Sequence, residues 1–169
     1  MHTVAATRTI DMPVATVWNT IDDFGNVYRF HPKLEHSGSI NDVATGEGAK
    51  RQCDFYDGYA IREEVVESVD RERLVIDTYD TGTIPLRENV TRMDLEPIDE
   101  NSTEVTMTMS YVPKYGPVGW LMDKLMMKSQ LRDLLEDILA GLDTHMQTGE
   151  IVGRNGNPGA ADASTAMAA

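Results

Sequence analysis

His31 is the residue whose type and position best suit chemistry in this chain of 169 residues, where it stands in the run Phe30-His31-Pro32. An imidazole can donate or accept a proton near neutral pH, which makes His31 a candidate acid–base group or ligand contact. The same run also fits a histidine that caps a short helix or forms a hydrogen bond at the edge of a cavity. No residue is therefore assigned a catalytic role from the sequence.

Tyrosine and methionine side chains add candidates for a ligand site. Tyr79 and Tyr111 could each offer a phenol hydroxyl to a ligand carbonyl, or could be core residues with a satisfied hydroxyl. Met107, Met109 and Tyr111 alternate with polar residues and so share one face of a strand. Methionine fills irregular apolar space, which fits both a plain core and an adaptable ligand cavity.

The remaining reactive residue types give no sign of a metal or cofactor site. Cys53 is the only cysteine, so the chain forms no intrachain disulfide and no thiolate metal cluster, and we expect a buried, inert thiol. His145 has no second histidine or cysteine at metal-ligand spacing. The sequence contains no phosphate-binding glycine loop, no Ser-His-Asp order and no dinucleotide-binding fingerprint. We therefore expect neither a metal nor a cofactor.

Composition excludes several classes of partner. The formal net charge is −13 and the pI is about 4.6, so the field of the protein repels nucleic-acid backbones and anionic membrane surfaces. Hydrophobic residues make up 41% and charged residues 25%, as in an ordinary globular domain. No apolar run reaches transmembrane length, and residues 1–10 lack the apolar segment of a secretory signal. We expect a cytoplasmic protein with no nucleic-acid partner and no membrane insertion.

Alternating and helical hydrophobic patterns predict one α+β domain. A helix begins near Pro13, and a short helix or loop follows at Gly25–Pro32. Short connections between successive strands favour an antiparallel meander. The predicted strands are Thr3–Asp11, Leu34–Val43, Lys50–Tyr56, Tyr59–Val69, Leu74–Tyr79, Leu86–Pro97 and Thr103–Val112.

A long C-terminal helix, Pro117–Thr148, is predicted to cover one face of this sheet. Its second half carries apolar residues at helical spacing, namely Leu131, Leu135, Ile138 and Leu142. The apolar stripes of the two halves point in different directions, so the helix either bends near residues 128–130 or packs its halves on different partners. We expect the domain to span residues 1–149 and residues 150–169 to form a flexible tail.

The order of several short motifs resembles the Bet v 1-like superfamily, the START-related SRPBCC or polyketide cyclase/dehydrase proteins. Within it the chain looks most like bacterial relatives of the abscisic-acid receptor branch. The resemblance implies a helix-grip fold, with about seven antiparallel strands curved around a long C-terminal helix and two short helices after the first strand. The motifs are Ile10–Trp18, Asp23–Pro32, Ile61–Asp70, Ile84–Asn89 and Lys114–Pro117.

The chain differs from the plant receptors in two loops, those that form the gate and the latch in the receptors. These differences argue against a receptor that closes over its ligand with a gate and a latch. The loop Asp57-Gly58-Tyr59-Ala60 is shorter than their gate loop, and Ile84-Pro85-Leu86 stands where they carry a His-Arg-Leu latch. His31 falls near the position of their ligand-binding lysine.

The resemblance also implies which strand faces line an internal cavity. It places charged residues inside, where they would either pair with one another across strands or form a polar end of the cavity. That polar end would bring Arg62, Glu64 and His31 together. The implied inward residues are Cys53, Phe55, Arg62, Glu64, Val66, Val75, Asp77, Tyr79, Arg87, Asn89, Thr91, Met93, Met107, Met109 and Tyr111.

Ligand binding is the function that these observations favour. We expect a hydrophobic small molecule of lipid, polyketide or aromatic type, bound between the sheet and the C-terminal helix by a monomer or a homodimer. The expected contacts are His31, Phe55, Arg62, Glu64, Asp77, Tyr79, Asn89, Met107, Met109 and Tyr111. The alternatives are a polyketide cyclase/dehydrase-type enzyme that uses polar cavity residues for acid–base chemistry, and an interaction protein with a collapsed cavity.

Overall fold

The computed structural model describes residues 1–114 and 126–156, and its elements follow the predicted order. Strand boundaries agree with the sequence pattern to within a few residues. The helical elements are α1 (Val14–Asp22), the 3-10 turns η1 (Phe24–Arg29) and η3 (Arg154–Gly156), and α3 (Lys128–Thr148). The strands are β1 (His2–Ile10), β2 (Leu34–Ser39), β3 (Lys50–Phe55), β4 (Ala60–Val69), β5 (Arg73–Asp80), β6 (Leu86–Asp99) and β7 (Ser102–Pro113).

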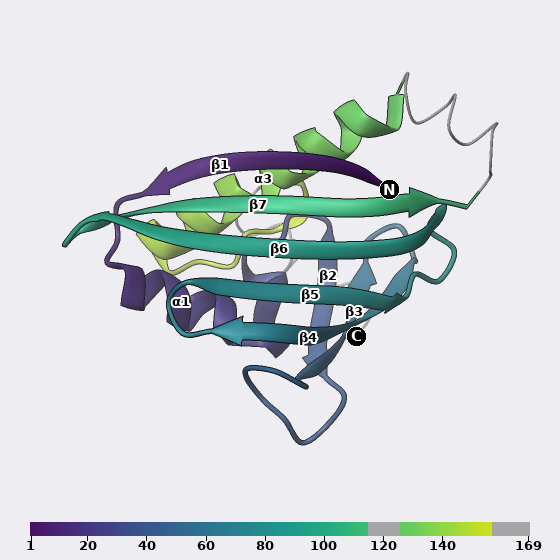
Figure 1. The fold of residues 1–169 in the computed structure, drawn as a ribbon, viewed down its shortest axis with the longest axis horizontal. Helices are drawn as coiled ribbons and strands as arrows, with labels where there is room; N and C mark the ends of the chain where they lie inside the picture. The colour runs from purple at the N-terminus through teal and green to yellow at the C-terminus, as the bar shows by residue number, and fades with distance from the viewer. Residues whose placement is uncertain (115–125, 157–169) are drawn as a thin grey trace, which may run out of the picture.

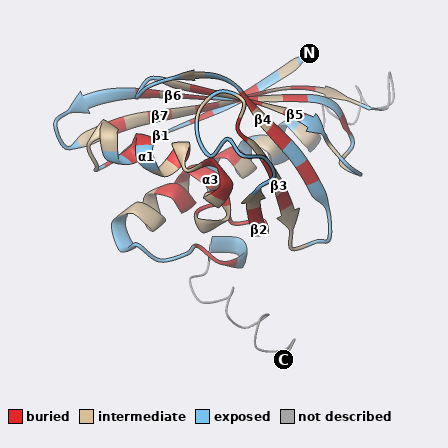
Figure 2. Cartoon of the chain, turned by 90° about the horizontal axis from the view of Figure 1, so that it is seen from below, coloured by how far each residue is buried: buried red, intermediate tan, exposed pale blue. Residues whose placement is uncertain are grey.

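The strands form one antiparallel sheet in the order β1-β7-β6-β5-β4-β3-β2. Consecutive strands from β2 to β7 are neighbours, as short connections require, and β1 joins the other side of β7 (Figure 1). The sheet curves so that β2 and β3 bend down toward the helices, and α1 and α3 lie on its concave side (Figure 2). This is the helix-grip arrangement that the resemblance implied.

The core lies between α3 and the concave face of the sheet. Leu135 and Leu142 of α3 are fully buried, and Ile138 is only 3% exposed. On β7 every second residue from Thr103 to Tyr111 is buried, which confirms the face predicted from alternation. The helix and the sheet thus bury the two apolar surfaces that neither could leave in water.

Only part of the predicted long helix falls within the described residues. As described, α3 begins at Lys128, and Met126 just before it is 62% exposed. Residues 117–125, with the first half of the predicted apolar stripe, lie outside the described residues. The two alternatives for the long helix, a bend or two packing partners, therefore remain a prediction.

The segment after α3 contacts the rest of the domain over residues 150–156, where the sequence predicts the start of a flexible tail. Val152 is only 2% exposed, and its N–H donates to the carbonyl of Arg29 at 2.8 Å. The N–H of Asn155 donates to the carbonyl of Pro32 at 3.0 Å, and its side-chain oxygen accepts from Lys33 Nζ at 3.0 Å. Residues 150–156 therefore pack against the segment that carries His31, although their small and polar composition suggested no such contact.

Gly141 lets α3 approach that same segment closely. A Cβ atom at this position would lie 2.1 Å from the carbonyl oxygen of Phe30, a backbone atom that cannot rotate away. The glycine is buried within the helix. Its missing side chain therefore sets the distance between α3 and residues 30–32.

Gly141→Ala should destabilise the protein, although alanine favours a helix interior by about 1 kcal/mol over glycine. The overlap with the Phe30 carbonyl forces a backbone shift, and overpacking of this kind costs about 1–3 kcal/mol. Urea unfolding measures the net effect. A variant more stable than the wild type would show that this close approach does not exist.

Candidate ligand-binding cavity

A cavity of about 140 Å³ lies between the concave face of the sheet and α3. Its size is close to that of an engineered cavity of roughly 150 Å³ that binds benzene. Most of its lining is apolar, with a few polar groups gathered on β3, β4 and β6. The apolar lining includes Val27, Phe30, Leu34, Phe55, Ile61, Leu74, Ile76, Ile84, Leu86, Met93, Met107, Met109, Leu131, Leu134 and Ile138.

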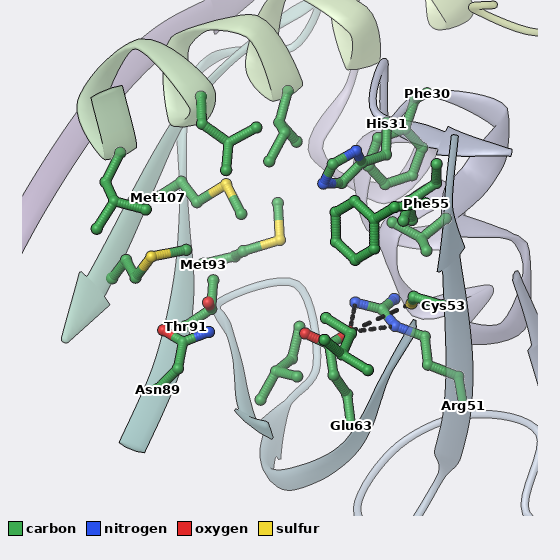
Figure 3. A pocket seen from close by; sticks show the side chains of 18 of the residues that line it. Phe30, His31, Arg51, Cys53, Phe55, Glu63, Asn89, Thr91, Met93 and Met107 are labelled. Atoms are coloured by element: carbon green, nitrogen blue, oxygen red, sulfur yellow. Dashed lines mark hydrogen bonds and ion pairs between the residues drawn. The ribbon is translucent and has the colours of Figure 1, made fainter. Parts of the chain in front are cut away.

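His31 lies at one wall of this cavity, directly after η1. Its backbone N–H donates to the carbonyl of Val27 at 3.0 Å, and its ring packs edge-on against Phe55 with the ring centroids 6.1 Å apart. The backbone N–H of Lys33 donates to its Nδ1 at 3.2 Å. Because Nδ1 accepts, the proton of the neutral ring is on Nε2. The ring points toward the cavity interior (Figure 3).

The surroundings of His31 keep its ring neutral. Burial, together with the nearby positive charge of Arg51, lowers the pKa of His31 from 6.5 to about 3. At neutral pH His31 is therefore a hydrogen-bond donor and no cation. An imidazole with so low a pKa is also a weak base, because a general base works best with a pKa near the working pH.

A buried ion pair forms the polar floor of the cavity. Arg51 of β3 and Glu63 of β4 are directly opposite each other in the sheet, and both are 7% exposed. Arg51 Nε and Nη2 both lie on Glu63 Oε2, at 2.7 and 2.6 Å (Figure 3). Arg51 Nη1 donates to the carbonyl of Phe24 at 3.0 Å. The guanidinium also stacks on the Phe24 ring, 3.9 Å from its centroid. Every nitrogen of the guanidinium thus has a partner within the chain.

Hydrogen bonds continue from the ion pair across two further strands. Thr78 of β5 donates its hydroxyl to Glu63 Oε1 at 3.2 Å, and Asn89 of β6 donates Nδ2 to the Thr78 hydroxyl at 3.0 Å. Since the carboxylate can only accept, it fixes the direction of both bonds. Asn89 Oδ1 is left buried without a partner among the described residues.

Cys53 belongs to the same polar group and is not reactive. It is 1% exposed, and its Sγ lies 3.6 Å from Glu63 Oε2. Burial raises the pKa of the thiol far above its usual range, so it stays protonated. The structure confirms the predicted buried thiol.

Five of the ten predicted contact residues line the cavity, and a sixth is buried beside it. His31, Phe55, Asn89, Met107 and Met109 lie in its wall. Tyr111 is fully buried, but its ring stacks against His2 with the centroids 5.6 Å apart, and it is not among the lining residues. Whether the five bind a ligand remains a proposal.

The other four predicted contacts, Arg62, Glu64, Asp77 and Tyr79, face away from the cavity, and this part of the prediction is wrong. Arg62 is exposed, and the Tyr79 side chain is 46% exposed. Glu64 pairs with Lys50 at 3.3 Å on the outer face, and the Lys50 ammonium lies 5.4 Å from the centre of the Tyr79 ring. The predicted meeting of Arg62, Glu64 and His31 therefore does not occur.

Asp77 and Arg87 also lie outside. Asp77 is half-buried on the outer face, where partial burial and the charges of Glu64 and Glu88 raise its pKa. Arg87 is exposed and pairs with Glu88 at 3.3 Å. On β4 and β5, the faces predicted to point inward therefore point outward. None of the residues predicted to face inward on these two strands lines the cavity, and this includes Val66 and Val75.

Sequence reasoning missed Arg51, Glu63 and Thr78, and a signal exists only for Thr78. On β4 the face of Ile61, Glu63, Val65 and Glu67 carries two charges, as does the face of Arg62 and Glu64, so the count does not choose between them. On β5 the face of Leu74, Ile76 and Thr78 carries none before the strand ends. Because burying a charge is costly, the less charged face is the inward one.

Within residues 1–114 and 126–156, no three His, Cys, Asp or Glu side chains are placed to hold a metal ion. No helix in these ranges is long and apolar enough to cross a membrane.

The chain belongs to the family described as polyketide cyclase/dehydrase and lipid transport, whose model matches residues 1–147. No curated protein matches it. Among solved structures, a protein from Thermus thermophilus has a TM-score of 0.72 and 20% identity, covering 88% of this chain and 99% of that one.

Two further solved structures share the fold. A START superfamily protein from Mycobacterium smegmatis has a TM-score of 0.71 and 15% identity, over 87% of this chain and 98% of that one. The di-domain ARO/CYC BexL from the BE-7585A biosynthetic pathway has a TM-score of 0.67 and 14% identity, over 86% of this chain and 47% of that one. At these identities the likeness establishes the fold alone.

Glu63→Leu should cost about 3–5 kcal/mol of unfolding free energy, because it leaves the Arg51 charge buried without its partner. The double variant Arg51→Met with Glu63→Leu should recover most of this loss, since well-packed apolar residues can replace a buried pair. Glu64→Leu is the matched control on the outer face and should cost under about 1 kcal/mol. Equal losses from the two glutamate variants in urea unfolding would contradict the assigned faces.

His31 should make the protein less stable in mild acid. Its pKa is about 3 when folded, against 6.5 for the free side chain, so below pH 6.5 the unfolded chain takes up a proton that the folded chain does not. Between pH 7 and 5 the wild type should lose about 1–2 kcal/mol more stability than His31→Asn, in which the amide oxygen can still accept from Lys33. Parallel stability curves for the two proteins would rule out this effect.

Proposed function

We propose that the protein binds an apolar small molecule in the cavity between the sheet and α3. The observation that carries the proposal is the cavity itself: about 140 Å³, lined mostly by aliphatic, aromatic and methionine side chains. A concave apolar site with a few fixed polar groups is typical of small-molecule binding. Membership in a family described by polyketide chemistry and lipid transport supports a ligand of lipid, polyketide or aromatic type.

The methionines favour a ligand over a plain core. Met93, Met107 and Met109 lie on the neighbouring strands β6 and β7, where Met93 is directly opposite Met107. Their unbranched side chains can rearrange around a bound molecule at little cost. The cavity can thus enlarge beyond the size of one aromatic ring.

A polyketide cyclase/dehydrase-type enzyme is the second candidate, favoured by one feature of His31. A neutral imidazole that donates from Nε2 to a ligand carbonyl would polarise it, which assists aldol closure or dehydration. Proton abstraction has less support, because Glu63 is committed to Arg51, Cys53 stays protonated and His31 is a weak base. For this reason we favour binding without turnover.

Native mass spectrometry of the protein purified from its own host tests the proposal. We expect a retained small molecule, and Met109→Arg should lose it, because a cationic side chain fills the cavity without a partner. Val66→Arg is the matched control, since Val66 is 45% exposed on the outer face and should leave the ligand bound. Circular dichroism verifies that both variants are folded. A folded Met109→Arg protein that keeps its ligand would place the site elsewhere.

The remaining predictions about the protein's setting are part of this proposal. We expect a cytoplasmic monomer or homodimer that acts without cofactor, metal or nucleic acid.

A further inference from the structure

We propose that the cavity selects uncharged ligands that present a carbonyl-type hydrogen-bond acceptor to His31, and that it rejects carboxylates. This inference rests on the proposed function and narrows its ligand class. Under this inference, neutral ketones, esters and quinones are possible ligands, whereas fatty acids and other organic anions are not. Some polar groups of the cavity wall are already hydrogen-bonded within the protein, whereas others are available to a ligand.

Arg51 is the only lysine or arginine among the described lining residues, but it is not available to a ligand anion. Two of its nitrogens lie on Glu63 at 2.7 and 2.6 Å, and the third donates to the Phe24 carbonyl at 3.0 Å. The Phe24 ring covers one face of the guanidinium. The pair as a whole is neutral, so a carboxylate in the cavity would meet no uncompensated positive charge among the described lining residues.

The acceptors of Glu63 and Thr78 are also committed, whereas Asn89 Oδ1 is buried without a partner among the described residues. Both carboxylate oxygens of Glu63 receive hydrogen bonds, one from Arg51 and one from Thr78. The Thr78 hydroxyl in turn receives the amide of Asn89. A ligand cation at Glu63 would therefore have to displace bonds that already exist, at the cost of leaving a buried group unpaired. A neutral ligand that also carries a hydroxyl could donate to Asn89 Oδ1 without displacing any bond.

His31 supplies the oriented donor. Among the lining residues that the structure describes, His31 Nε2 and the Thr91 hydroxyl form no hydrogen bond with the protein. The Thr91 hydroxyl can rotate, whereas the Lys33 N–H and the Phe55 ring hold the imidazole in one orientation. The His31 Nε2–H is thus a fixed donor on a largely apolar wall, which suits a carbonyl oxygen.

An anion would bind poorly to this wall. Moving a carboxylate out of water is costly unless a positive group compensates it, and protonation of His31 is opposed by its burial and by the charge of Arg51. A ketone or an ester loses far less hydration and gains one hydrogen bond. The arrangement therefore discriminates by charge as well as by shape.

Three probes built on one benzene ring suit the size of the cavity: acetophenone, benzoate and α-methylstyrene. The substituents on the ring have similar shapes. That of acetophenone is a neutral hydrogen-bond acceptor, that of benzoate is an anion, and that of α-methylstyrene is a hydrocarbon. Binding is measured at pH 7.5 by chemical-shift titration of the isotope-labelled protein. α-Methylstyrene tests the apolar cavity of the proposed function alone. Acetophenone and benzoate test the selectivity proposed here.

Two His31 variants distinguish loss of the hydrogen-bond donor from a change in the folded structure. His31→Asn keeps an acceptor for Lys33 but removes the donor on Nε2, whereas His31→Gln keeps an amide N–H near that position. We expect His31→Asn to weaken acetophenone binding roughly fivefold and to leave α-methylstyrene unchanged. His31→Gln should retain part of the acetophenone affinity. The affinity for α-methylstyrene is compared between proteins and not with that for acetophenone, because the hydrocarbon leaves water more readily than the ketone.

Glu63→Gln tests the rejection of anions. It removes the countercharge of Arg51 with little change of shape, so a folded variant should bind benzoate at least roughly tenfold more tightly than the wild type does. Should this variant fail to fold, the wild type still decides, because acetophenone must bind at least roughly tenfold more tightly than benzoate.

Specific results would overturn the inference. Benzoate binding to the wild type as tightly as acetophenone would refute charge selection while leaving ligand binding intact. Acetophenone affinity that survives His31→Asn, or that is lost in Thr91→Val instead, would refute the His31 anchor. If α-methylstyrene itself does not bind, the apolar cavity of the proposed function fails, and the present inference fails with it.

Discussion

The buried pair of Arg51 and Glu63 is the constraint on which much of the interior depends. Neither charge can stay unpaired away from water, so β3 and β4 must keep the register that sets the two residues opposite each other. The carboxylate then orders Thr78 and Asn89 on the next two strands. One electrostatic requirement thus links β3, β4, β5 and β6 at the level of side chains.

Packing of α3 against the curved sheet supplies the second constraint. The helix buries Leu135 and Leu142 completely, and Gly141 brings it against the segment that carries His31. Residues 150–156, which follow the C-terminal end of α3, contact the same segment through Val152 and Asn155. The backbone on either side of His31 is therefore held by α3 and by residues 150–156, and a ligand would meet a wall that is already ordered, which lowers the cost of binding.

The balance of charge in the cavity bears on the choice between binding and catalysis. Acid–base catalysis needs a group whose pKa lies near the working pH. Here the candidate groups do not meet this requirement: Glu63 is committed to its ion pair with Arg51, whereas burial keeps the Cys53 thiol protonated and the His31 ring neutral. What is left is an apolar space with the His31 donor and the unpartnered Asn89 Oδ1, which is consistent with the proposed binding of a neutral molecule. The family to which the chain belongs covers both binding and chemistry, so the difference lies in these side chains and not in the fold.

The sequence by itself determined the elements, their order and the cleanest faces. Alternation in β7 and helical spacing in α3 are local patterns that burial of one face imposes, so Met107, Met109, Leu135 and Leu142 could be placed inside from the sequence. The tertiary structure decided the faces of β4 and β5, where apolar and charged residues occur on both sides. It paired Arg51 with Glu63 rather than placing Arg62 and Glu64 inside, because cross-strand register depends on residues far apart in the chain. For the same reason it alone showed that Val152 is buried and that Gly141 permits the close approach of α3 to the carbonyl of Phe30, next to His31.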